Sequence, residues 1–264
     1  MIITLYKSIG LGLRFVLVTD LHDLKYGNLV QLIKTQKPDA ILLAGDILER
    51  MGEYSDLAEE WKAKVNGHNL FKDFLNRSID ILSDRNLSRS YFGTEFLRKV
   101  STIAPTFYSL GNHEWCFSDK DYSLFKECGI TVLDNADVEV IIKGKTIRFG
   151  GLSTRFDLKW LREYSKKAGY KILLCHHPEY YRKMIMNTEI DTFDLVLGGH
   201  YHGGQIRIPF IGGLYAPYVG WFPKYTKGLF VGEHSKCVLS TGLGTEGIIP
   251  RFNNPPEIVI IDLK

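Results

Sequence analysis

Short apolar runs that end in polar residues able to bind a metal ion recur five times along this chain. The residues that follow them are Asp20-Leu21-His22, Gly45-Asp46, Gly111-Asn112-His113-Glu114, Cys175-His176-His177-Pro178 and the loop 198–204, Gly-Gly-His-Tyr-His-Gly-Gly. Short runs rich in apolar and β-branched residues are typical of buried strands. Open α/β sheets place their ligand sites at the carboxyl ends of such strands. The recurrence therefore predicts an α/β fold that gathers these residues in one place.

The loop 198–204 carries His200 and His202 within a run of glycines. Alternate residues of a strand point in opposite directions, but a glycine-rich turn lets both imidazoles turn toward one point. Taken alone, the loop is also compatible with a tight hairpin that carries two surface histidines. The other motif residues have ordinary interpretations too, such as a core histidine or a helix-capping aspartate. Their recurrence at five strand ends favours a shared site.

The motifs together supply oxygen and imidazole donors of the kind that hold divalent metal ions. They are Asp20, His22, Asp46, Asn112, His176, His200 and His202. Mn, Fe and Zn all accept such a mixed set, so the sequence does not rank them. Two cations a few ångströms apart repel each other, and a shared carboxylate offsets that repulsion. We expect a hydrolytic centre with two divalent metal ions, in which a bridging water becomes a hydroxide nucleophile.

The segments between the motifs predict an α/β fold made of two packed mixed β-sheets, a β-sandwich, flanked by helices. Strands are expected at 14–19, 39–44, 106–110, 131–133, 138–142, 146–149, 171–174, 195–197 and 257–263, and helices at 28–36, 121–128 and 157–167. Residues 51–104 are richer in polar residues and predict a helical insertion. Ser55 and Thr94 are its candidate N-caps, and Leu70, Phe74 and Ile81 mark an amphipathic helix. We expect one domain over residues 1–264.

The motif order D-x-H, G-D-x-x-E, G-N-H-E, H-x-P and G-H-x-H-G-G resembles the calcineurin-like metallophosphoesterase superfamily. The resemblance covers nearly the whole chain outside the helical insertion. The extension G-H-x-H-G-G-Q-I-R-x-P and the tail 241–257 are similar to a subgroup of bacterial phosphodiesterases that includes UDP-diacylglucosamine pyrophosphatases. The resemblance implies a dinuclear-metal-dependent phosphoesterase, acting on a phosphodiester or pyrophosphate bond by attack of a metal-bridging hydroxide.

The resemblance also implies a role for each ligand. By this resemblance, one metal ion is bound by Asp20, His22 and His202, and the other by Asn112, His176 and His200. Asp46 bridges both ions. A non-catalytic phosphoesterase-fold scaffold and a nuclease of the same superfamily are alternatives. The complete ligand set argues against a scaffold. A net charge of +3 gives no basic stripe that would indicate a nuclease.

Further residues near the motifs have two interpretations each. The resemblance places His113 beside the leaving-group oxygen and makes Glu49 the acid that orients it, although Glu49 would also suit a solvated helix start. Arg251 is a candidate for binding a substrate phosphate, or a surface arginine. His177 either faces away from the site or lines its pocket. Tyr201 stands where threonine or serine is more usual, and either packs or narrows the pocket.

Composition indicates an ordinary globular protein with a phosphorylated small-molecule or lipid-linked substrate and no nucleic acid partner. The four cysteines form no C-x-x-C pair, which favours free thiols in a reducing compartment. No apolar run approaches the length of a membrane span, and residues 1–13 lack the features of a signal peptide. We expect a cytoplasmic protein, and peripheral association with a membrane is compatible with this. The oligomeric state is left open.

Overall fold

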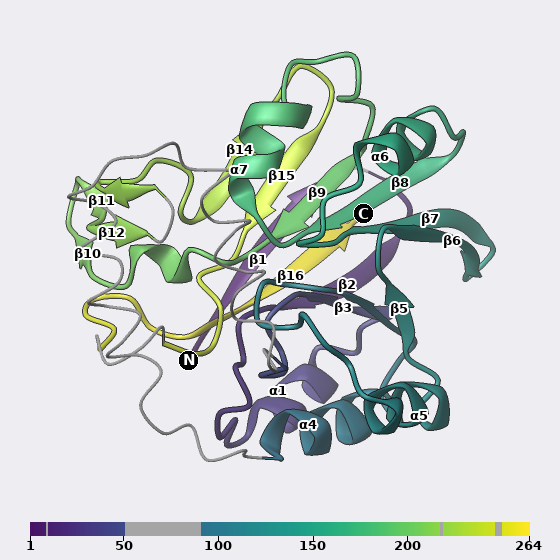
Figure 1. The fold of residues 1–264 in the computed structure, drawn as a ribbon, viewed down its shortest axis with the longest axis horizontal. Helices are drawn as coiled ribbons and strands as arrows, with labels where there is room; N and C mark the ends of the chain where they lie inside the picture. The colour runs from purple at the N-terminus through teal and green to yellow at the C-terminus, as the bar shows by residue number, and fades with distance from the viewer. Residues whose placement is uncertain (9, 51–90, 217–218, 246–249) are drawn as a thin grey trace.

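The structure is a computed structural model, and it describes residues 1–8, 10–50, 91–216, 219–245 and 250–264. Within these residues two mixed sheets of six strands pack face to face, and helices cover both outer faces (Figure 1). The predicted α/β sandwich is therefore confirmed. The amphipathic helix expected around Leu70 and the candidate cap Ser55 lie outside the described residues.

The first sheet is parallel from β2 to β5, and β16 runs antiparallel to β2. Its strands in spatial order are β1 (Ile2–Ser8), β16 (Glu257–Leu263), β2 (Leu13–Val18), β3 (Ala40–Ala44), β4 (Thr106–Ser109) and β5 (Thr131–Leu133). The strand β1 was not predicted. It pairs in parallel with β16 at the sheet edge, and its residues alternate between intermediate and exposed, so its apolar signal is weak.

The second sheet is parallel from β7 to β15 and has antiparallel strands at both edges. Its strands in spatial order are β14 (Gly228–Val231), β15 (Lys236–Leu239), β9 (Leu195–Gly198), β8 (Tyr170–Cys175), β7 (Lys145–Leu152) and β6 (Ala136–Ile142). Between β6 and β7 the two turn residues, Lys143 and Gly144, both have positive φ, which is typical of a tight hairpin.

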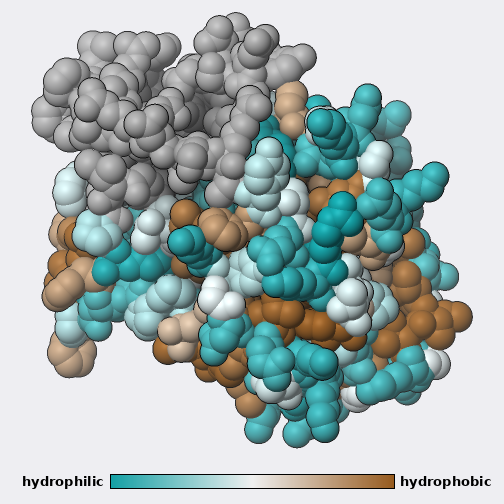
Figure 2. Space-filling model, turned by 90° about the horizontal axis from the view of Figure 1, so that it is seen from below, coloured by the Kyte–Doolittle hydropathy of each residue, from teal (hydrophilic) through white to brown (hydrophobic). Residues whose placement is uncertain are grey.

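Helices cover the two sheets on opposite sides of the sandwich (Figure 1). The first sheet is covered by α1 (Leu29–Thr35), α4 (Phe92–Val100) and α5 (Asp119–Glu127), and the second by α6 (Leu158–Ser165), α7 (Pro178–Tyr180) and the π-helix η1 (Tyr181–Ile185). From the side of α1, α4 and α5, the surface shows hydrophilic groups interspersed with apolar ones (Figure 2). No described helix is long and apolar enough to cross a membrane.

Two helix starts differ from those expected. Thr94 lies inside α4 and donates its hydroxyl to the carbonyl oxygen of Tyr91 at 2.8 Å, so its prediction as an N-cap is wrong. The helix begins earlier because the Asp23 carboxylate accepts the backbone N–H of Gly93 at 2.9 Å and so satisfies a donor of its first turn. Ser118 caps α5 in a reciprocal capping box with Asp121, which moves the start of that helix two residues before the predicted Asp121.

The core between the sheets is aromatic near its centre and ends at the motif loops. The rings of Phe107 and Phe149 stack with centroids 4.3 Å apart, and Phe15 meets Phe149 edge to face at 5.7 Å. Strands β2, β3, β4, β8 and β9 are almost wholly buried. Because their carboxyl ends open on the same side of the sandwich, their loops converge there.

Candidate metal centre

Each predicted ligand lies just beyond the carboxyl end of one of these five strands. Asp20 and His22 follow β2, Asp46 follows β3, Asn112 follows β4, His176 follows β8, and His200 and His202 follow β9. Five of them have positive φ, namely Asp20, His22, Asp46, His200 and His202. Non-glycine residues adopt this region at a cost of about 1 kcal/mol or more each, and they cluster at functional sites. The strain therefore supports a common function for these loops.

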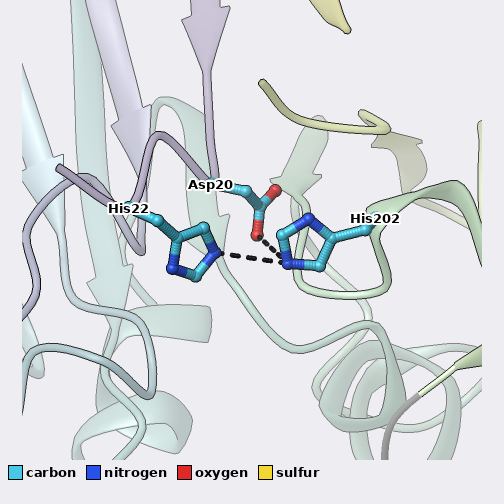
Figure 3. A group of neighbouring side chains, drawn as sticks. All are labelled: Asp20, His22 and His202. Atoms are coloured by element: carbon cyan, nitrogen blue, oxygen red, sulfur yellow. Dashed lines mark hydrogen bonds and ion pairs between the residues drawn. The ribbon is translucent and has the colours of Figure 1, made fainter. Parts of the chain in front are cut away.

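Asp20, His22 and His202 form the first group of donors (Figure 3). The Nε2 atoms of His22 and His202 face each other at 3.2 Å, and the Asp20 carboxylate lies above them with Oδ1 at 3.9 Å from His202 Nε2. The opposite nitrogen of His202, Nδ1, lies 3.2 Å from the carbonyl oxygen of Gly244. This contact aims Nε2 at the group.

Asp46, His176 and His200 form the second group, and Asn112 lies beside them. His176 Nε2 is 3.0 Å from Asp46 Oδ2 and 3.2 Å from the amide oxygen of Asn112. Its Nδ1 lies 2.8 Å from the carbonyl oxygen of Ala44, which fixes the ring as a ligand would require. His176 and His200 are both buried, with ring centroids 5.0 Å apart.

Asp46 lies between the two groups. Its Oδ2 is 3.0 Å from His176 Nε2 and 3.8 Å from His22 Nε2, while Oδ1 accepts the backbone N–H of His113 at 2.9 Å. Burial raises the pKa of Asp46, but the neighbouring histidines outweigh this and hold it well below its usual range. A Cβ atom at Gly111 would collide with this carboxylate, so glycine is required there. The position suits a carboxylate shared by two cations.

The charges and hydrogen bonds of the site fit bound cations. Burial lowers the pKa of His202 to about 3, so its ring is neutral at physiological pH, the form that binds metal. For His176 burial also acts to lower the pKa, but Asp46 outweighs it and raises the pKa to about 9. In addition, Asp20 Oδ2 is buried without a hydrogen-bond partner among the described residues. A carboxylate oxygen in that position gains most from a cation.

Residues 13–204 match the family model described as calcineurin-like phosphoesterase. The chain belongs to that family. It is a metal-dependent phosphoester hydrolase, since the family and the clustered donors agree. The superfamily expected from the motifs is thus confirmed.

Two bacterial proteins and one solved structure illustrate what this phosphoesterase is similar to. It is 25% identical to phosphodiesterase YaeI of Escherichia coli (strain K12), over 98% of this chain and 84% of that protein. It is 31% identical to the uncharacterized protein YpbG of Bacillus subtilis (strain 168), over 63% of this chain and 61% of YpbG. A 5'-nucleotidase precursor from Thermus thermophilus shares the fold, with a TM-score of 0.50 at 13% identity, over 87% of this chain and 49% of that one.

Glu49 contacts both His113 and His22. One carboxylate oxygen lies 2.8 Å from His113 Nδ1 and the other lies 2.6 Å from His22 Nδ1. Burial raises the pKa of Glu49, but the two histidines outweigh it and hold the pKa well below its usual value. The contact with His113 matches the role that the family resemblance implied for Glu49. The contact with His22 was not anticipated, because nothing in the spacing of the two residues indicates it.

Glu114 fixes the loop after β3. Its carboxylate accepts the backbone N–H groups of Asp46, Ile47, Leu48 and Gly111 at 2.7–3.0 Å. It is buried, and the burial raises its pKa. These contacts give Glu114 a structural role in the site.

Sequence reasoning missed Glu179, which lies buried behind His200. Its Oε1 is 3.2 Å from His177 Nδ1 and 4.0 Å from His200 Nε2, and Oε2 accepts the hydroxyl of Tyr201 at 2.7 Å. His177 and Tyr201 are therefore buried packing residues in the wall of the site. The signal in the sequence was the acid directly after His176-His177-Pro178, which resembles an ordinary helix-start glutamate.

Arg251 lies close to the first group but donates its hydrogen bonds to the backbone. Its guanidinium bonds the carbonyl oxygens of Gly244, at 2.6 Å, and of Thr241. Burial is the main cause that lowers its pKa to about 10. These contacts give Arg251 a structural role next to Asp20 and His202.

Proposed function

We propose that this phosphoesterase hydrolyses a phosphodiester or pyrophosphate bond with two divalent cations. The observation that supports it is the position of Asp46 Oδ2, 3.0 Å from His176 of one donor group and 3.8 Å from His22 of the other. One cation would be held by Asp20, His22 and His202, and the other by Asn112, His176 and His200, with Asp46 shared. Mn, Fe or Zn suits these donors.

Bound divalent cations supply Lewis acidity toward phosphoryl oxygens and increase the acidity of a nearby water molecule. The protein itself provides a water-excluding site for the cations and a donor for the proton that the leaving group needs. Buried rings of His176, His200 and His202 exclude bulk water from the donor groups. His113 is less buried, with 26% of its side chain exposed, so an entering substrate can reach it.

His113 would protonate the leaving-group oxygen. Its Nδ1 lies 2.8 Å from the Glu49 carboxylate, which fixes the proton on that nitrogen and favours the charged ring. Proton transfer to the substrate would then run through Nε2. Glu49 holds the ring in place and compensates its charge in the same step.

Two similarities bear on the class of substrate. The relative named phosphodiesterase YaeI matches 98% of this chain, which favours a phosphodiester. The similarity of the motif extension to UDP-diacylglucosamine pyrophosphatases favours a pyrophosphate within an amphiphile. In either bond the leaving group departs from phosphorus through an oxygen atom, so protonation by the exposed His113 would serve both.

The test is turnover of bis-p-nitrophenyl phosphate by purified protein, freed of metal and then supplied with Mn²⁺, Fe²⁺ or Zn²⁺. A screen of nucleotide, nucleotide-sugar and lipid-linked diesters follows with the best metal. Asp46→Asn serves as the inactive control. Absence of turnover with every divalent metal, in folded protein that binds them, would favour a scaffold instead.

A further inference from the structure

Two short β-hairpins and a neighbouring loop project from the end of the sandwich where the site lies, and we call them the hairpin lobe. It comprises the described residues of 205–227 together with 250–254. Its strands are β10 (Arg207–Ile208), β11 (Gly212–Gly213), β12 (Tyr215–Ala216) and β13 (Gly220–Trp221). Figure 1 shows them beyond the ends of both large sheets.

The lobe exposes large apolar side chains, and two of them, Phe210 and Ile211, form the tip of the β10–β11 hairpin. Those exposed by more than half are Phe210, Ile211, Trp221, Phe222 and Phe252, and Phe210 is fully exposed. Apolar groups also lie at the edge of the surface where Figure 1 places these hairpins (Figure 2). Phe210 and Phe222 have φ of 66° and 53°, which is unfavourable for bulky residues. Displaying such groups costs solvation and backbone free energy, so a binding role is indicated.

The charge of the lobe has one sign. Residues 205–227 and 250–254 include Arg207, Lys224, Lys227 and Arg251 and contain no aspartate or glutamate. Arg207 and Arg251 donate hydrogen bonds to backbone carbonyl oxygens and lie near the buried acids Glu257 and Asp20. Lys224 is exposed, whereas Lys227 pairs with Glu257 at 3.0 Å. Lys224, close in sequence to the exposed Trp221 and Phe222, therefore supplies a solvent-facing positive charge that favours an anionic surface.

The lobe is joined rigidly to the metal-site loop. Asn254 donates from Nδ2 to the carbonyl oxygens of His202, at 2.6 Å, and of Gln205, at 3.1 Å. Arg207 donates to the carbonyl oxygen of Gly203 at 2.7 Å. A surface that binds the tips would be held at a fixed position relative to His202.

We propose that the hairpin lobe inserts its exposed apolar side chains, with the Phe210–Ile211 tip foremost, into the headgroup region of a bilayer containing anionic lipid. Aromatic rings with nearby cations are the side chains that partition to this interface. Narrow hairpin tips suit insertion between headgroups, whereas a stable protein complex needs a continuous surface of about 800 Å² on each partner. If the proposed function also holds, the substrate is an amphiphile whose phosphate group lies at the bilayer surface.

The experiment is co-sedimentation of the full chain with vesicles of phosphatidylcholine and phosphatidylglycerol in equal amounts. Phe210→Ser combined with Ile211→Ser should weaken binding by about tenfold or more, because two large apolar side chains no longer enter the interface. Ile141→Ser is the matched control, since Ile141 is 73% exposed on β6 at the opposite edge of the second sheet and should bind like the wild type. Circular dichroism confirms that each variant is folded.

Failure of the wild type to bind these vesicles would overturn the proposal. A loss of vesicle binding in Ile141→Ser as large as that in the double variant would also overturn it. A dimer in light scattering that the double variant dissociates would assign the tips to self-association instead. Hydrolysis of bis-p-nitrophenyl phosphate should be unchanged in the double variant. Vesicle binding is measured without turnover. A protein that binds vesicles but hydrolyses no diester would therefore contradict the proposed function and leave the membrane proposal intact.

Discussion

The Nδ1 atom of His22 lies 2.6 Å from Oε1 of Glu49, so a candidate metal ligand and the candidate proton donor His113 share one carboxylate. Here a single side chain determines the ring orientation of both, and loss of its charge should affect metal binding and proton transfer together.

Glu49→Gln should lower turnover and also weaken metal binding by about 10–100-fold, because His22 loses the carboxylate that increases its basicity. Metal titration and kcat of the same preparation measure both effects. Glu139→Gln is the control, since Glu139 is an exposed acid on β6 paired with Arg148. Reduced turnover with unchanged metal affinity would mean that Glu49 acts on His113 alone and does not support metal binding by His22.

Asp46→Asn should abolish activity and reduce the bound metal at both positions, because the shared carboxylate is lost. Asn112→Ala should mainly weaken one position, because its amide oxygen lies only beside the second group. Elemental analysis of both purified variants gives the number of ions. A full complement in Asp46→Asn would contradict the bridging position.

His113→Ala should keep the metal and the fold and lose about 10²–10⁴-fold in turnover, the usual size of an acid–base contribution. The loss should be smaller for substrates with good leaving groups, which need less protonation. A series of aryl phosphodiesters measures this dependence. Loss of metal would show that His113 is a ligand. An equal loss of turnover for every substrate in the series would mean that His113 stabilises charge and does not donate a proton.

Tyr201→Phe should destabilise the protein by about 1–2 kcal/mol, because it removes a hydrogen bond to the buried Glu179 carboxylate and leaves an acceptor unsatisfied. Urea unfolding of the metal-free protein measures the change. Tyr122→Phe, at a residue 53% exposed on α5, should change stability little. Equal effects of the two variants would mean that the Glu179 contact contributes nothing.

Metal affinity should increase with pH up to about pH 9. In the metal-free protein the pKa of His176 is raised from 6.5 to about 9, mainly by Asp46 against the effect of burial, so the ring carries a proton that metal must displace. The contribution of that proton to the folding stability of the metal-free protein is fully present below pH 6.5 and is lost as pH rises through 9. Calorimetric titration at several pH values should show affinity rising by about tenfold per pH unit. Affinity independent of pH would exclude a protonated His176.

The sequence alone determined the sandwich and the residues at its strand ends. Strand burial and ligand chemistry are local properties: β2, β3, β4, β8 and β9 are short apolar runs, and each motif follows its strand directly along the chain. The first residue of a helix was harder to predict, as Thr94 shows, because the first turn of α4 is satisfied by the carboxylate of the distant Asp23 and not by a hydroxyl of its own segment.

Only the tertiary structure decided which distant residues share a contact. Glu49 and His22 are 27 positions apart, and His200 lies in the loop after β9 whereas Glu179 lies in α7, so neither pairing has a periodic signal. Arg251 was equally undecided, because an arginine looks the same in sequence whether it meets a phosphate or the carbonyl oxygens of Thr241 and Gly244. Such contacts depend on where the two sheets bring their loops together, which is set by the whole core and not by any segment of it.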